Sequence, residues 1–175
     1  MKGVDIFDGV FTHQECEKFR EILLYKCQYR YGERDNPHTK PSGIVCDFTE
    51  FIKSDVDINT ETTHLNLFLK SLTRKIYERN ENLKKMTIYR VYVNLFTPNE
   101  DPSFHIDGEN TVTCLYYLNP SLDPNEGGET QFLIDEEIKG VISKPGRLAM
   151  FSGEILHRAT AFKNHPRLTL AFKFV

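Results

Sequence analysis

The pattern of apolar positions divides the chain into a helical first part and a strand-rich second part. Apolar residues recur every three or four positions after Thr12. Thr12 stands three residues before Glu15, which is the spacing of a capping box. The same period returns at Leu65, Leu69, Leu72 and Ile76, with charged residues on the other side of this second predicted helix. The pattern predicts two helices, one over about 13–28 and one over about 61–80.

Beyond Lys85 the period changes to two, which is the repeat of an extended strand. Clusters of Pro, Gly, Asn and Asp separate the alternating segments, as turns between strands require. The expected strands cover 86–96, 111–118, 129–134, 137–143, 147–151 and 166–175. Residues 29–59 carry only a weak apolar signal, so we expect a long loop there, with at most one short strand.

Two helices followed by many short strands are typical of a mostly β protein. The fold class expected is a double-stranded β-helix, or jelly roll, with the two N-terminal helices packed on one outer face. A chain of 175 residues is long enough for one hydrophobic core and short for two. Residues 1–175 are therefore expected to form a single domain.

Composition and charge narrow the range of partners. The formal net charge of -3 gives no general attraction to phosphate backbones, so nucleic acid is not the expected partner. The first residues lack the pattern of a signal peptide, and no apolar run is long enough for a membrane span. The four cysteines include no CxxC pair, which favours a reduced, cytoplasmic protein. The oligomeric state is left open.

Several expected strands carry a polar face. Arg167, Thr169 and Lys173 share one side of the last strand, while Tyr92 and Asn94 share one side of 86–96. On a single strand such a face is usually exposed to solvent. Several polar faces in one barrel would instead line a polar cavity, and that cavity is the predicted place for a site.

Three residues form a candidate metal site. His105 and Asp107 stand two positions apart, so an extended backbone directs both side chains to the same side. His157 follows the strand 147–151 and is the best third ligand, because a neighbouring strand would return it to the pair. Two histidines and one carboxylate are the ligands of non-haem iron(II) oxygenases, although zinc hydrolases use similar sets. The other histidines have ordinary surface positions: His13, His38, His64 and His165.

Arg167 favours iron over zinc at this site. A dicarboxylate that chelates iron at one end needs a cation for its other end, and arginine offers a planar bidentate fork. Arg167 lies ten residues after His157, with Thr169 on the same face of the strand. Alone, Arg167 would be better explained as half of a surface ion pair.

Taken in order, His-Ile-Asp at 105–107, Gly-Gly-Glu-Thr at 127–130, His157 and Arg167 resemble the prolyl 4-hydroxylase-like branch of the 2-oxoglutarate oxygenases. The resemblance covers roughly residues 86–175. It implies that His105, Asp107 and His157 bind iron(II) and that the cosubstrate contacts a set of polar residues: Arg167, Tyr117, Thr169, Asn94 and Tyr92.

The resemblance also implies the chemistry. The expected cofactors are Fe(II), 2-oxoglutarate and O2, and the expected reaction is hydroxylation of a prolyl residue in a peptide or protein, with release of succinate and CO2. The alternatives are a hydroxylase of a free amino acid or another small molecule, a nucleic-acid demethylase, and a non-catalytic jelly-roll binding protein.

A loop over about 28–42 is where related hydroxylases keep a mobile segment that covers the substrate. The alternative is a polar connection without a role in binding. If the loop covers the substrate, the expected contacts are its aromatic and basic residues: Tyr29, Arg30, Tyr31 and Arg34.

Overall fold

The computed structural model describes residues 3–34, 41, 43–53, 60–98, 100, 102–121 and 123–175. Its strands are β1 Val4–Phe7, β2 Arg30–Tyr31, β3 Ile44–Asp47, β4 Ile88–Phe96, β5 Val112–Tyr117, β6 Thr130–Ile134, β7 Glu137–Val141, β8 Leu148–Ser152, β9 His157–Ala159 and β10 Arg167–Phe174. The α-helices are α1 His13–Lys26, α2 Thr49–Lys53 and α3 Thr60–Arg79, and short 3₁₀ turns cover Glu81–Lys85 and Pro124–Glu126.

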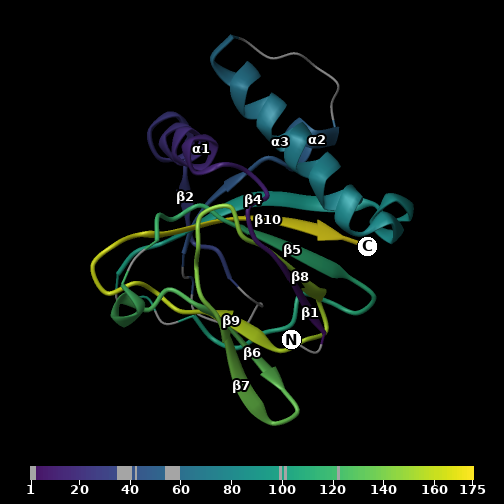
Figure 1. The fold of residues 1–175 in the computed structure, drawn as a ribbon, viewed down its shortest axis with the longest axis vertical. Coiled ribbons are helices and arrows are strands. Elements are labelled where there is room, and N and C mark those ends of the chain that lie inside the picture. The colour runs from purple at the N-terminus through teal and green to yellow at the C-terminus, as the bar shows by residue number, and fades with distance from the viewer. Residues whose placement is uncertain are drawn as a thin grey trace.

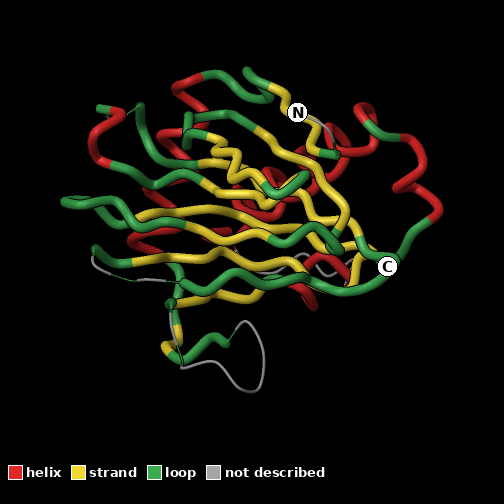
Figure 2. The backbone as a smooth tube through the Cα atoms, turned by 90° about the horizontal axis from the view of Figure 1, so that it is seen from below, coloured by secondary structure: helices red, strands yellow, loops and turns green. Residues whose placement is uncertain are grey.

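The strands form two sheets. The larger sheet has seven strands in the order β1-β8-β5-β10-β4-β3-β2, and the smaller has three in the order β7-β6-β9. All strand pairs among the described residues are antiparallel. The helices cover one face of the larger sheet and the smaller sheet lies on the opposite side (Figure 1). Seen from that opposite side, the strands lie in front of the helices (Figure 2).

The two long helices begin close to where the sequence predicts. Thr12 caps α1 by accepting a hydrogen bond from the Glu15 amide, and the Glu15 carboxylate accepts one from the Thr12 amide in return. The apolar side of α3 is fully buried against the sheet, with Leu69 and Leu72 in the same cluster as Leu170 of β10. This layer between helices and sheet is the main hydrophobic core.

The expected strands are all present, with ends shifted by a few residues. The sequence did not predict β1 or β9, and the expected long loop 29–59 holds β2, β3 and α2 among its described residues. Such short segments are defined by pairing with distant partners, as β1 is by β8, and local alternation carries little of that information. The two antiparallel sheets and the long helices agree with the expected class, whereas the double-stranded β-helix and the single domain stay predictions. Among the described residues, no helix is long and apolar enough to cross a membrane.

β10 lies in the middle of the larger sheet and faces two environments. Its even-numbered residues, among them Leu170 and Phe172, belong to the helix-side core. Its odd-numbered residues face the side of the smaller sheet, where Arg167, Thr169 and Lys173 line a cavity of about 260 Å³. The alternation of the strand thus separates the core from the polar cavity.

Candidate functional site

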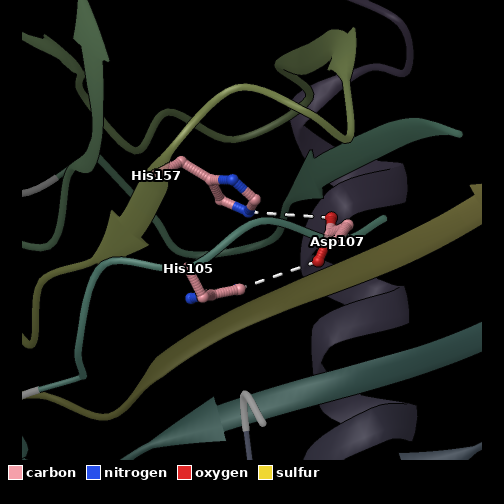
Figure 3. Close-up of side chains that lie close together, drawn as sticks. All are labelled: His105, Asp107 and His157. Carbon is pink, nitrogen blue, oxygen red and sulfur yellow. Dashed lines mark ion pairs between the residues drawn. The ribbon is translucent and has the colours of Figure 1, made fainter. Parts of the chain in front are cut away.

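The candidate metal ligands are brought together by a backbone bridge between two distant segments. The amide of His105 donates to the carbonyl of His157 over 2.9 Å, and the amide of His157 donates to the carbonyl of His105 over 3.0 Å. The Asp107 amide donates to the carbonyl of Gly153 over 2.7 Å. Since residues paired in this way present their side chains on the same side, the three side chains converge (Figure 3).

The three side chains are close enough to hold one ion. Their ligand atoms all lie within 4.8 Å of one another. The Asp107 carboxylate is 3.8 Å from Nε2 of His105 and 3.6 Å from Nε2 of His157. Two imidazoles and one carboxylate on one side of an ion leave other coordination positions open, so the donor set fits a catalytic iron or zinc ion.

Backbone carbonyls orient both imidazoles for metal binding. Nδ1 of His157 lies 2.8 Å from the carbonyl oxygen of Ile155, and Nδ1 of His105 lies 3.1 Å from that of Ser103. A proton on each Nδ1 leaves the lone pair on Nε2, the nitrogen that faces Asp107. Burial lowers the pKa of His157 to about 4, although Asp107 opposes the shift, so His157 is neutral near pH 7.

Lys173 is a charged residue of this site whose cavity-facing position is predicted by strand alternation, whereas its role is not. Its Nζ lies 2.5 Å from Oδ1 of Asp107, and Thr113 donates a hydrogen bond to Oδ2. Burial would raise the pKa of Asp107, but Lys173 and His157 outweigh burial and lower it. Burial would likewise lower the pKa of Lys173, but Tyr92 and Asp107 raise it. Both groups are therefore charged near pH 7.

Arg167 provides a buried cation at another wall of the cavity. Its side chain is among the largest fully buried ones. Its guanidinium donates to the carbonyl of Gly128 over 3.0 Å, to Oγ1 of Thr130 over 2.7 Å and to Oγ1 of Thr169 over 3.4 Å. Among the described residues, no carboxylate pairs with it. A buried cation without an internal counter-ion is suited to an anionic ligand.

Thr130 stands between Arg167 and Tyr117. The Tyr117 hydroxyl donates to Oγ1 of Thr130 over 2.7 Å, and Thr130 lines the cavity whereas Tyr117 is fully buried behind it. In the sequence, Thr130 stands out only as the last residue of the Gly-Gly-Glu-Thr motif. The role expected for Tyr117 toward the cosubstrate stays a prediction.

Tyr92 and Asn94 also line the cavity. Asn94 faces Thr169 across the β4–β10 pair, and its Oδ1 is buried without a hydrogen-bond partner. A half-turn of the amide brings the NH2 group to the same place, where it could donate to a carboxylate. The ring of Tyr92 lies under two cations, 4.0 Å from the Arg90 guanidinium carbon and 5.5 Å from Nζ of Lys173. Asn94 thus offers an unused polar group to a cosubstrate.

The expected substrate loop is only partly described, because residues 35–40 and 42 lie outside the described residues, as does His38. Tyr29 donates a hydrogen bond to the Leu23 carbonyl and packs against the core, whereas Arg30 and Tyr31 are exposed. Arg34 lines the cavity together with Glu33. This end of the loop therefore reaches the cavity, and the substrate contacts remain predictions.

Gly128 shapes the Arg167 end of the site. Its backbone has φ +77°, and a Cβ there would overlap the ring of Phe162. We expect Gly128→Ala to lower the free energy of unfolding by about 2–5 kcal/mol, because left-handed strain and overpacking add. Gly9→Ala is the matched control, since Gly9 has φ +65° with nothing within 4 Å of a Cβ, and it should cost about 1–2 kcal/mol. Equal losses in urea denaturation would contradict the packing argument.

The sequence and the structure both resemble known proteins. Residues 89–174 match the 2OG-Fe(II) oxygenase superfamily. No curated protein sequence matches the chain. A Pseudomonas putida prolyl-4-hydroxylase structure has a TM-score of 0.72 at 16% identity, covering 98% of this chain and 91% of its own.

Two other solved structures show how broadly the fold is used. A prolyl hydroxylase from Trichoplax adhaerens, solved with a hypoxia inducible factor peptide fragment, has a TM-score of 0.73 at 16% identity, over 98% of this chain and 83% of its own. The non-heme alpha ketoglutarate dependent epimerase SnoN has a TM-score of 0.63 at 16% identity, over 99% of this chain and 77% of its own. At these identities the likeness concerns the fold alone.

Proposed function

We propose that this chain, whose residues 89–174 match the 2OG-Fe(II) oxygenase superfamily, hydroxylates a prolyl residue of a peptide or protein, with release of succinate and CO2. The superfamily's cofactors are Fe(II), 2-oxoglutarate and O2. One observation carries the proposal: one cavity contains both the cluster of His105, Asp107 and His157 and the buried guanidinium of Arg167.

The metal end of the cavity would be held by the three clustered side chains. Bound Fe(II), together with O2 and 2-oxoglutarate, supplies the oxidising chemistry. His105 and His157 would present Nε2 to the metal, because their Nδ1 atoms are engaged by backbone carbonyls. Asp107 would bring the negative charge, which its lowered pKa keeps available near pH 7.

Arg167 would hold the distal carboxylate of 2-oxoglutarate. Its guanidinium donates hydrogen bonds to the hydroxyls of Thr130 and Thr169, and its Nε–H donates to the carbonyl of Gly128, so the cation is oriented before the cosubstrate binds. Asn94 would donate to a cosubstrate oxygen from the neighbouring strand. Such pre-orientation lowers the cost of ordering these side chains on binding.

The peptide side of the proposal rests on resemblance and on the loop end near the cavity. Two of the three solved structures named above are prolyl hydroxylases, one of them with a bound peptide. The Arg90 guanidinium donates two hydrogen bonds, of 2.7 and 3.1 Å, to the Glu33 carboxylate. This pair attaches this end of the loop to β4 beside the cavity. A segment held in this position would form one wall around a peptide.

A second candidate, a hydroxylase of a small acidic molecule such as a free amino acid, is favoured by the charges of the cavity. Its described lining includes four cationic side chains but only two carboxylates: Arg34, Arg90, Arg167 and Lys173 against Glu33 and Asp107. This excess of positive charge occurs in a protein of net charge -3. Such a cavity attracts anions.

Succinate formation tests the proposal. The purified protein is incubated with Fe(II), ascorbate and 2-oxoglutarate, with proline-containing peptides in one series and free acidic and neutral amino acids in the other. Stimulation by peptides, with hydroxyproline in the product, supports the prolyl hydroxylase. Stimulation by free acids alone supports the second candidate. No binding of 2-oxoglutarate and no succinate would reject an oxygenase and favour a non-catalytic binding protein.

A further inference from the structure

We infer that Lys173 is a counter-ion of Asp107 that stabilises the metal-free protein and competes with a metal ion for the Asp107 carboxylate, so that it weakens metal binding. The inference rests on the proposed metal site. It concerns a residue that is neither a metal ligand nor a contact of Arg167.

Lys173 and Asp107 form a tight and buried pair. Nζ of Lys173 lies 2.5 Å from Oδ1 of Asp107, and the two side chains are only 12% and 2% exposed. Oδ2 accepts a hydrogen bond from the Thr113 hydroxyl, so each carboxylate oxygen of Asp107 has a partner within the protein. Among the described residues, Lys173 is the only permanent cation within ion-pair distance of Asp107.

The sheet places this lysine, and not another cation, beside the carboxylate. Lys173 of β10 is the register partner of Thr113 on β5 and of Arg90 on β4, so two cations stand opposite each other. Arg90 is directed to other carboxylates, with Glu33 at 2.7 Å and Asp47 at 3.5 Å. Like charges on facing positions are unfavourable unless each has its own partner, and here each has one.

The Lys173–Asp107 pair explains how the metal-free protein can be stable. A buried carboxylate without a counter-ion is costly, and the Asp107 side chain is only 2% exposed. Lys173 removes that cost and holds the Asp107 carboxylate between the two histidines. The site is therefore preformed before any metal arrives.

The same charge opposes metal binding. A divalent ion held by Asp107 would share that carboxylate with the Lys173 ammonium, which contacts its Oδ1, and like charges repel strongly where water is scarce. A residue that only positioned Asp107 would make metal binding tighter. A counter-ion makes it weaker, so removal of Lys173 has opposite effects on metal affinity under the two roles.

Lys173→Met tests the inference with Mn(II) as the only ligand, so that no turnover is needed. We expect the metal-free variant to unfold several degrees below the wild type, and its Mn(II) dissociation constant, measured by calorimetry, to fall at least about tenfold. Lys144→Met is the matched control, because Lys144 also pairs with an aspartate, Asp8 at 3.0 Å, but is about half exposed and does not line the cavity that holds His105, Asp107 and His157. It should leave Mn(II) affinity unchanged.

Unchanged or weaker Mn(II) binding by Lys173→Met would overturn the inference. If that variant folds only when Mn(II) is present, the result supports it, and Lys173→Arg then provides the affinity comparison: with the cation kept, its Mn(II) binding should stay within about threefold of wild type. Failure of the wild type itself to bind Mn(II) would instead reject the proposed metal site, and this inference with it.

Discussion

His105→Ala is expected to abolish succinate formation while the protein stays folded. The His105 side chain is 17% exposed and lies at the cavity, so its loss removes little buried apolar surface. Loss of a residue that hydrogen-bonds to a metal ligand typically costs about 10–100-fold in metal affinity or activity. Loss of a ligand itself should cost at least about as much. Turnover is measured as succinate at saturating 2-oxoglutarate, and folding by thermal unfolding.

His165→Ala provides the control for this substitution. His165 is exposed in the loop before Pro166, so the same change of residue type there should leave activity at the wild-type level. Full activity of His105→Ala, or an equal loss in both variants, would contradict the metal assignment.

Asp107 is a less suitable position for this test. Its side chain is only 2% exposed, and its removal leaves the buried Lys173 ammonium without a carboxylate partner. Breaking a buried ion pair from one side typically costs about 3–5 kcal/mol. Loss of activity in Asp107→Ala would therefore combine loss of the metal with loss of stability.

Arg167→Ala should raise the 2-oxoglutarate concentration needed for activity far more than it changes metal affinity. The guanidinium is fully buried and has no carboxylate partner among the described residues, so a bound carboxylate would lose its charge-assisted bonds. We expect a loss of roughly 2–5 kcal/mol, between one and four decades in affinity for 2-oxoglutarate. Titration of 2-oxoglutarate at saturating metal gives this number directly.

Tyr117→Phe is the graded comparison for Arg167→Ala. The Tyr117 hydroxyl donates to Thr130, which in turn accepts from Arg167, so its removal affects the cosubstrate only through that chain of hydrogen bonds. The expected cost is on the order of 1 kcal/mol. A larger effect from Tyr117→Phe than from Arg167→Ala would place the cosubstrate elsewhere in the cavity.

The sequence predicts those parts of the fold that depend on local pattern. The capping box at Thr12 locates the start of α1 to the residue, and strict alternation locates β10. Alternation does not predict β1, because its four residues are defined by pairing with β8, far along the chain. The same limit explains why β9, three residues long, was not predicted.

For the candidate site, the spacing of residues identifies the side chains but not their partners. His105, Asp107 and His157 meet as expected, and the three-residue cluster follows from one backbone bridge. The pattern placed Lys173 on the cavity face of β10, but only the register with β5 brings it to Asp107. Likewise, Thr130 separates Tyr117 from the cavity because of side-chain packing, which a motif does not encode.

The two faces of β10 have a consequence for how this protein tolerates mutation. Substitutions at even-numbered positions such as Leu170 or Phe172 alter the helix-side core and should change how much folded protein accumulates. Substitutions at odd-numbered positions such as Thr169 or Lys173 alter the cavity wall and should change ligand preference. Because neighbouring residues of a single strand affect separate traits, selection can retune the cavity in single-codon steps while the adjacent residues keep the molecule folded.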